Sequence, residues 1–156
     1  MRRPEPGLSM LVVAFALSSL APRFVGAQAP DGAKIFAATC QACHQVSGLG
    51  VPNQFPPLVG NEWVLGNEDR LVMIVLHGLV GEIEVEGETF NGAMPTLGPT
   101  FSDAELAAVA SYVRRSWGNS AAPIATATVT RVRLAHAMRT TPWTVAELRR
   151  ATLGKP

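Results

Sequence analysis

The sequence predicts a small all-α domain that carries a short β-hairpin and a C-terminal extension. Two segments have apolar residues at helical spacing: residues 71–76 follow the N-cap signal Asn67, and residues 103–117 follow Ser102, which begins a capping box. A third segment, residues 82–86, alternates strictly between acidic and apolar side chains, the pattern of a half-buried strand. A chain of 156 residues has room for one such domain and additional segments.

The N-terminus, residues 1–27, has the features of a secretory signal peptide. Arg2 and Arg3 precede an apolar run over residues 8–20, and small residues lead to an expected cleavage after Ala27. The apolar run is shorter than the roughly 20 residues that span a bilayer. We therefore expect export and no membrane span after cleavage, with a retained anchor as the disfavoured alternative.

The chemistry of the chain centres on the motif Cys40-Gln41-Ala42-Cys43-His44. A helix that begins at the N-cap Asp31 is expected to lead into it. C-x-x-C-H is the pattern by which a c-type haem is attached, each thiol adding to one vinyl group. Three residues are about one helical turn, so both sulfurs can reach one porphyrin edge. The motif predicts one covalent haem c, with Cys40 and Cys43 attached to it and His44 as the proximal iron ligand.

Three other uses of the motif are weighed against haem. A disulfide redox site usually accompanies a βαβ pattern, which is not visible here. A structural zinc site needs four ligands, whereas the chain has two cysteines, and His77 and His136 stand apart from them. A structural disulfide between Cys40 and Cys43 would close a very short loop and restrict the unfolded chain little. Haem is favoured, and attachment of a c-type haem outside the cytoplasm agrees with export to a bacterial periplasm.

A second axial ligand decides whether the iron is closed or open to small molecules. The candidates are Met73, Met94, Met138, His77 and His136. We predict Met94, which lies in an expected loop after the turn signal Asn91-Gly92, where Pro95 favours an extended conformation of the residue before it. Met73 lies inside an apolar helix and is interpreted as core. For His77, at the end of that helix, a capping or surface role is favoured.

Charge is distributed unevenly along the mature chain. Residues 28–118 contain ten acidic and four basic side chains, whereas residues 119–156 contain one acidic and six basic ones. This asymmetry indicates that the C-terminal part docks on its own domain or on a partner. The basic residues are few and are not interleaved with aromatics, so nucleic-acid binding is not expected.

Residues 119–156 are predicted to form a basic C-terminal extension with a short helix. Residues 120–130 are rich in Ala and Thr and are interpreted as a linker or an extended strand. Thr144 and Glu147 form a second capping box, which predicts a helix to about Ala151. Trp143, just before it, is expected to anchor this helix by packing on the main domain.

Together these residues resemble class I cytochromes c, over residues 31–118. The resemblance is carried by Gly32 and Phe36 in the first helix, Cys40-x-x-Cys43-His44, Pro56-x-Leu58-x-Gly60, Met94-Pro95, and Tyr112 in the last helix. It implies the cytochrome c fold, with about three main helices around the covalent haem. It also implies that the carbonyl of Pro56 accepts a hydrogen bond from His44, that Leu58 packs on the haem, and that Gly32 and Tyr112 lie where two helices cross.

A narrower resemblance links the chain to small cytochromes paired with periplasmic quinoprotein or molybdenum dehydrogenases. The residues that carry it are 75–79, the hairpin, 91–95, 116–119 and 142–144. It implies an electron-transfer protein rather than an enzyme, taking electrons from a periplasmic dehydrogenase and passing them to another cytochrome or an oxidase. Two alternatives stay open: a haem enzyme or small-ligand sensor with an open sixth site, and a cytochrome subunit of a dehydrogenase complex.

Overall fold

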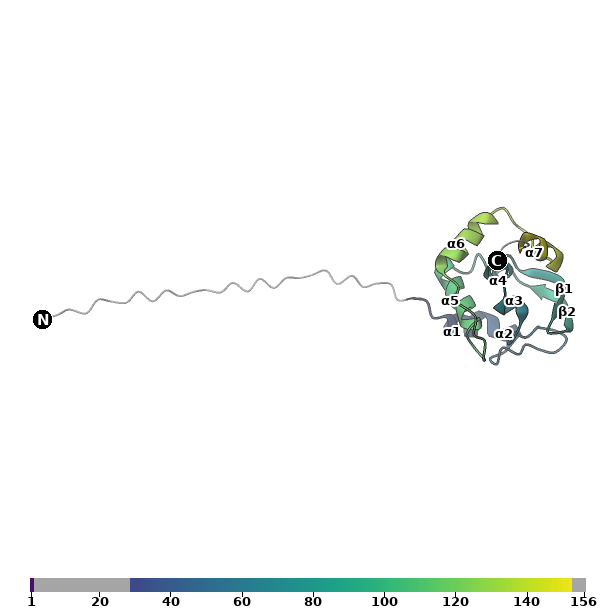
Figure 1. The fold of residues 1–156 in the computed structure, drawn as a ribbon, viewed down its shortest axis with the longest axis horizontal. Helices are drawn as coiled ribbons and strands as arrows, with labels where there is room; N and C mark the ends of the chain where they lie inside the picture. Colours follow the sequence, from purple (N-terminus) through teal and green to yellow (C-terminus); the bar gives the residue numbers. More distant parts are fainter. Residues whose placement is uncertain (2–28, 153–156) are drawn as a thin grey trace.

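The computed structural model describes Met1 and residues 29–152 (Figure 1), so the predicted signal peptide lies, apart from Met1, outside the described residues. In chain order the elements are α1 (Gly32–Ile35), the π-helical η1 (Phe36–Cys40), α2 (Gln41–His44), α3 (Glu62–Leu65), α4 (Glu68–His77), β1 (Leu79–Val85), β2 (Glu88–Met94), α5 (Asp103–Val113), α6 (Thr126–Ala135) and α7 (Val145–Thr152). Within the described residues no helix is both long and apolar enough to cross a bilayer.

The first helical path runs through α1, η1 and α2 and ends at the C-x-x-C-H motif. As predicted, Asp31 caps it, its carboxylate accepting hydrogen bonds from the amides of Ala33 and Lys34 at 3.1 and 3.2 Å. Near its start this path crosses α5 at Gly32, where a Cβ atom would lie 2.2 Å from the carbonyl oxygen of Ala108 and 2.9 Å from Cβ of Tyr112. Only glycine allows the two helices to approach so closely, and the crossing orients the motif relative to α5.

The predicted hairpin is present and is longer than expected. β1 and β2 pair antiparallel from Leu79↔Met94 to Val85↔Glu88. Ile83 and Val85 are buried while the glutamates between and before them face water, which confirms the alternating pattern.

The expected turn at Asn91-Gly92 and the loop around Met94 are wrong. Asn91 and Gly92 lie inside β2, opposite Glu82 and Gly81, and Met94 is the last residue of that strand. The local turn propensity of Asn-Gly is overridden because the cross-strand ladder supplies hydrogen bonds to this segment from partners nine or more residues away.

Helix α4 agrees with its predicted signals, whereas α5 is shorter than predicted. The side chain of Asn67 caps α4 through the amide of Arg70, and Gly78 ends it with a positive φ of 80°. The capping box at Ser102 is present, but α5 ends at Val113, four residues before Trp117. The chain turns there because Arg114 is drawn inward, donating to three backbone carbonyl oxygens, those of Val64, Gly66 and Ala122.

The C-terminal extension folds back on the domain. Residues 120–125 have no regular structure, as expected of a linker, but residues 126–130 of the predicted linker or strand begin helix α6. Val129 and Val132 of α6 are 0% and 2% exposed and lie on one face, against α4 and α5. The β-branched residues of this segment have a weak helix propensity, which suggested a linker or a strand instead of a helix. Burial against the domain outweighs that local preference. The capping box of Thr144 and Glu147 begins α7 as predicted, and Trp143 is buried.

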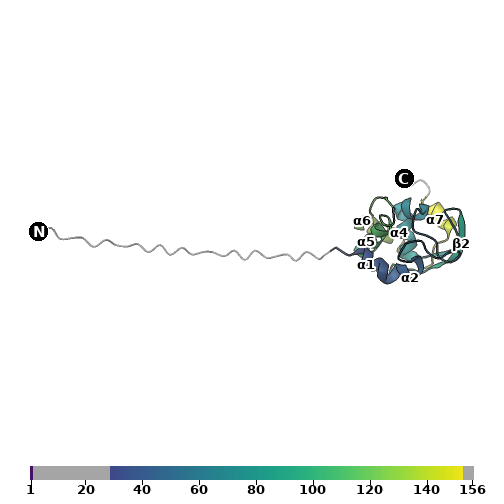
Figure 2. The same ribbon diagram turned by 90° about the horizontal axis from the view of Figure 1, so that it is seen from below.

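Charge complementarity holds the extension in place. Arg131 donates to Asp69, at the start of α4, with an N–O distance of 2.9 Å. Arg133 donates to Asp103 at 2.7 Å and to the carbonyl oxygens of Gly98 and Phe101. The basic extension thus neutralises part of the acidic domain, and α6 and α7 lie at the end of the domain opposite α1 and α2 (Figures 1 and 2).

The described residues therefore form a helical domain with one two-stranded sheet. The sequence led us to expect about three main helices. α4 and α5 are two of these and the path through α1 to α2 is the third, while the short α3 and the ten-residue α6 were not predicted. α3 is capped by Asn61, whose side chain accepts from the amide of Trp63. Four residues are too few to leave a periodic signal in the sequence.

We predict that Gly32→Ala destabilises the folded haem protein by about 1–3 kcal/mol, because the new methyl group would force α1 away from the backbone of α5. Chemical denaturation followed by the haem absorbance measures the change. Ala33→Ser adds one atom on the exposed side of the same helix and is expected to stay within about 0.5 kcal/mol of wild type. Equal stability of the two variants would contradict the close crossing.

A second prediction concerns acid stability of the extension. Hydrogen bonds from the amide of Thr144, and then from Arg139 and the Thr144 hydroxyl, lower the pKa of Glu147 from 4.5 to about 2. The charged carboxylate therefore stabilises the fold above pH 4.5, and this contribution is lost as the pH falls from 4.5 towards 2. We expect Glu147→Gln to flatten the loss of thermal stability over this range. Glu82→Gln, on the exposed face of β1, should leave the slope as in wild type.

Candidate functional site

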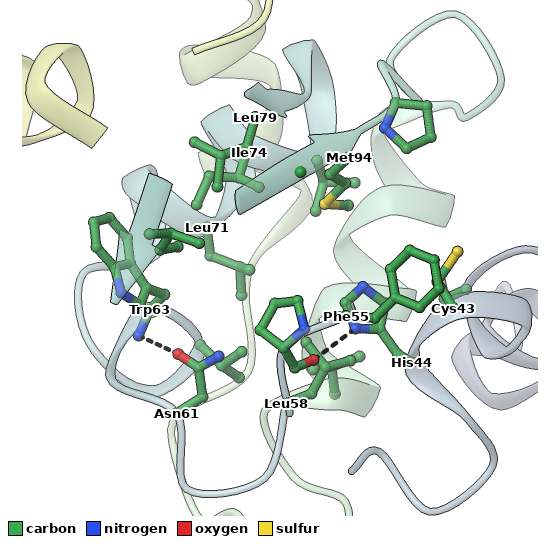
Figure 3. A pocket seen from close by; sticks show the side chains of 18 of the residues that line it. Cys43, His44, Phe55, Leu58, Asn61, Trp63, Leu71, Ile74, Leu79 and Met94 are labelled. Carbon is green, nitrogen blue, oxygen red and sulfur yellow. Dashed lines mark hydrogen bonds between the residues drawn. The ribbon is translucent and has the colours of Figure 1, made fainter. Parts of the chain in front are cut away.

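The structure encloses an apolar cavity between the helices and the hairpin. Its empty space comes to about 1290 Å³ including the open mouth. All six residues that the sequence singled out line this cavity: Cys40, Cys43, His44, Pro56, Leu58 and Met94. They come from three separate stretches of the chain, and Figure 3 shows His44 and Met94 on facing walls. The cavity is therefore the place where the predicted ligands can act on one bound group.

The two cysteines lie on the helical path at the bottom of the cavity. Cys40 ends η1 and Cys43 lies in α2, and both are free thiols. Burial, and next the neighbouring Cys43, raises the pKa of Cys40 to about 11. A disulfide redox site needs a lowered thiol pKa, which keeps the reactive thiolate available. Two half-buried thiols on one helical turn instead suit addition to two vinyl groups on one edge of a flat ligand.

His44 is held in one tautomer. Its Nδ1 lies 3.1 Å from the carbonyl oxygen of Pro56, which can only accept, so Nδ1 carries the proton. This is the hydrogen bond that the family resemblance implies. Figure 3 shows the second ring nitrogen on the side towards Met94. Burial lowers the pKa of His44, with the Pro56 bond acting in the opposite direction, so the ring is favoured in the neutral form that binds metals.

Met94 faces His44 from the end of β2. Its pairing with Leu79 holds it from one side. After it, the hydroxyl of Thr96 donates to the carbonyl oxygen of His77, and the amide of Leu97 donates to that of Val75, at 2.8 and 3.1 Å. The strand and the end of α4 thus restrain the thioether in place of the rigid loop that the sequence suggested.

The other ligand candidates lie away from the cavity. Met73 is 2% exposed inside the core, as its position in an apolar helix predicted. Met138 is 93% exposed, and His136 belongs to the C-terminal extension. The ring of His77 is packed edge-on against Trp143 and His136 rather than free at the surface. None of these four side chains lines the cavity.

The loop that carries Pro56 and Leu58 is anchored at its far end by Asn119. This side chain is 7% exposed. Its amide group donates to the carbonyl oxygens of Leu58 and Val113 at 2.9 and 2.8 Å, and its oxygen accepts from the amide of Gly60 at 3.0 Å. In the sequence, Asn119 belongs to residues 116–119, which carry the narrower family resemblance, and has no structural role assigned to it. A buried asparagine with three backbone partners is visible only once residues about sixty positions apart have been brought together.

Most of the cavity wall was not predicted as part of the site. It includes Trp63, Leu71, Ile74, Leu79, Ile83, Phe90, Val109 and Val113. In the sequence these residues have the periodicity of ordinary core positions, and nothing local separates a core residue that meets protein from one that faces a cavity. Trp63 is fixed by its indole nitrogen, which donates to the carbonyl oxygen of Glu84 at 2.9 Å.

The residues present fit a haem c by their chemistry. A neutral imidazole and a soft thioether face each other across apolar walls, and two thiols stand at one edge. The wall is almost wholly apolar, as a macrocycle with a buried face requires.

Comparison with known proteins agrees with this geometry. Residues 27–113 match the sequence profile of the family described as cytochrome C oxidase, cbb3-type, subunit III, over more than half of the chain. The chain belongs to the cytochrome c family. Cytochrome c-552 of Thermus thermophilus is 40% identical over 94 residues, which cover 58% of this chain and 70% of the relative. The resemblance to class I cytochromes c, and with it the C-x-x-C-H motif as a haem-binding signature, is thereby confirmed.

Two further relatives are named as parts of dehydrogenases. The cytochrome c subunit of the quinone alcohol dehydrogenase of Gluconobacter oxydans is 32% identical over 98 residues, which are 62% of this chain and 20% of the subunit. The fructose dehydrogenase cytochrome subunit of Gluconobacter japonicus is 31% identical over 110 residues, which are 66% of this chain and 22% of the subunit. This cytochrome therefore spans only about a fifth of those subunits. The family match ends at Val113, so α6 and α7 lie beyond it.

We predict that Asn119→Leu lowers the free energy of unfolding by about 1–3 kcal/mol, because two carbonyls and one amide lose their buried partner. Denaturant titration of the haem protein measures the loss. Asn119→Asp keeps an oxygen for the Gly60 amide but removes both donors, so it should also be less stable than wild type. Wild-type stability of the leucine variant would contradict the anchoring role.

Proposed function

We propose that this cytochrome is a mono-haem carrier of single electrons. One haem c is attached through Cys40 and Cys43, with His44 and Met94 as the two axial ligands. The observation that carries the proposal is the placement of the His44 imidazole and the Met94 thioether on facing walls of one apolar cavity. Two occupied axial positions leave no site for a substrate, which favours electron transfer over a haem enzyme or a small-ligand sensor.

Each side chain of the site has a separate role in the proposed function. When bound, the haem supplies the one-electron chemistry of its iron. His44 contributes a lone pair whose direction is set by the Pro56 carbonyl. Met94 contributes a soft sulfur that favours reduced iron and raises the reduction potential. Leu58 and the apolar walls exclude water from the faces of the ring, and no side chain needs to accept or donate a proton.

We further propose where this carrier works. Residues 1–27 act as a signal peptide that is cleaved near Ala27, residues 28–118 form the cytochrome domain, and residues 119–156 form its extension, so the mature protein is periplasmic. Its electron donor is a dehydrogenase of the same compartment, and its acceptor is another cytochrome or an oxidase. The relatives named as dehydrogenase cytochrome subunits support this pairing.

A second candidate function is a permanent cytochrome subunit of a dehydrogenase complex. It rests on the same two relatives. Gel filtration of the native cell extract distinguishes the two. A free carrier elutes at the size of one small domain, whereas a subunit elutes with dehydrogenase activity and stays with it at high salt.

We predict that Met94→Ala keeps the covalent haem but opens the iron to external ligands. The reduced wild-type protein should bind carbon monoxide slowly or not at all at neutral pH, because the thioether occupies the site. The variant should bind it stoichiometrically and at least about tenfold faster. Stopped-flow mixing with carbon monoxide and a pyridine haemochrome assay for covalent haem make both measurements.

The matched control is Met73→Ala, which removes a thioether of the same size from the core. It should lose stability without opening the iron. If Met73→Ala opened the iron to carbon monoxide and Met94→Ala did not, the assignment of Met94 as the iron ligand would be wrong. Rapid stoichiometric binding to the wild type would instead support a sensor or enzyme, and absence of covalent haem would contradict the whole proposal.

A further inference from the structure

The strand that carries Met94 belongs to a sheet whose other edge is covered by the C-terminal extension. Trp143 lies alongside β1 in a parallel bridge to Leu79. Its amide donates to the carbonyl oxygen of Gly78 at 3.0 Å, and its own carbonyl oxygen accepts from the amide of Val80 at 2.8 Å. Leu79 is therefore paired on both sides, with Trp143 on one and Met94 on the other.

The contact between this strand and Met94 is close. A Cβ atom at Gly78 would lie 2.6 Å from the carbonyl oxygen of Met94 and 3.1 Å from the carbonyl carbon of Pro95. Leu79 is 8% exposed and its side chain lines the cavity next to the thioether. A displacement of residues 78–80 would therefore move the backbone of Met94, because no space separates the two segments.

Apart from its two backbone hydrogen bonds to residues 78–80 and a contact with His77, Trp143 is held in place by other residues of the extension. Its ring is 5% exposed, and the guanidinium of Arg139 lies over it at 3.5 Å. Arg139 is in turn held by Glu147 at 2.9 Å and by the carbonyl oxygen of Pro142 at 2.7 Å. His77 and His136 contact the edges of the indole. Except for His77, the residues of this assembly lie outside the range that matches the family, 27–113.

We propose that Trp143 is a positioning residue for the sixth iron ligand: through its two backbone hydrogen bonds to residues 78–80 it holds β1 in register, and β1 holds the Met94 thioether towards the iron. The inference rests on the proposed role of Met94. The extension thereby determines how easily the iron exchanges Met94 for an external ligand. A tryptophan that only stabilised the fold would affect unfolding and leave this exchange unchanged.

The test uses the full-length haem protein with Trp143→Ala. We expect carbon monoxide to bind the reduced variant at least about fivefold faster than wild type. The reduction potential should fall, because the methionine-ligated fraction decreases. The Val80 amide, which donates to Trp143, should exchange its hydrogen faster with solvent. Trp143→Phe keeps a buried ring and both backbone bonds and should restore wild-type values.

The matched control is Trp117→Ala, which removes the same side chain from the cluster with Phe36 and Tyr112. It should lower the unfolding temperature without changing the potential or the carbon monoxide rate. If Trp143→Ala and Trp117→Ala have the same effect on the reduction potential and on the rate of carbon monoxide binding, the inference is overturned. If Trp143→Ala does not yield folded haem protein, Arg139→Gln is tested in its place, because it removes the cation over the indole. We expect this variant also to bind carbon monoxide faster and to have a lower reduction potential. Unchanged values of both would overturn the inference.

Met94→Ala separates this inference from the proposed function. If that variant opens the iron and Trp143→Ala does not, only the positioning role falls. If Met94→Ala leaves the iron closed, the ligand assignment itself is wrong, whatever the result at Trp143.

Discussion

The structure depends on one constraint: an apolar cavity must be kept open between the walls that carry His44 and Met94, which lie fifty residues apart in the chain. Neither wall is rigid alone. The His44 wall is a short helical path fixed by its crossing with α5 at Gly32 and by the bond to the Pro56 carbonyl. The Met94 wall is a strand end fixed by its ladder to β1. The core on each side therefore serves chiefly to hold these two walls at a set separation.

Polar side chains with backbone partners provide much of that rigidity. Asn119, Arg114 and Asn61 are all buried, and each is bonded to the backbone of a segment that borders the cavity. Such bonds fix loops that have no regular structure, because an unpaired backbone group in a dry interior is costly. They explain how a loop rich in proline and glycine can present Pro56 and Leu58 in one orientation. At the other edge of the sheet the extension pairs with β1 through the backbone of Trp143.

The position of the extension accounts for part of the uneven distribution of acidic and basic residues along the chain. Two of its basic residues, Arg131 and Arg133, pair with Asp69 and Asp103 of the acidic domain, so part of the asymmetry is satisfied within the molecule. α6 and α7 bury Val129, Val132 and Leu148 in the same core as α4 and the sheet. The acidic face of the hairpin stays exposed to solvent.

The sequence by itself determined the elements that local chemistry encodes: the N-caps at Asp31 and Asn67, the capping boxes, the alternation of β1, and the motif from Cys40 to His44. The residues around Met94 singled it out among the candidate ligands, and the resemblance to cytochromes c then located Pro56 and Leu58. Only the tertiary structure decided that Met94 ends a strand, that residues 126–135 are a helix, that Asn119 anchors the loop of Leu58, and that Trp143 pairs with β1. The reason is physical, since those outcomes depend on hydrogen bonds and burial between segments far apart in the chain, which no local pattern records.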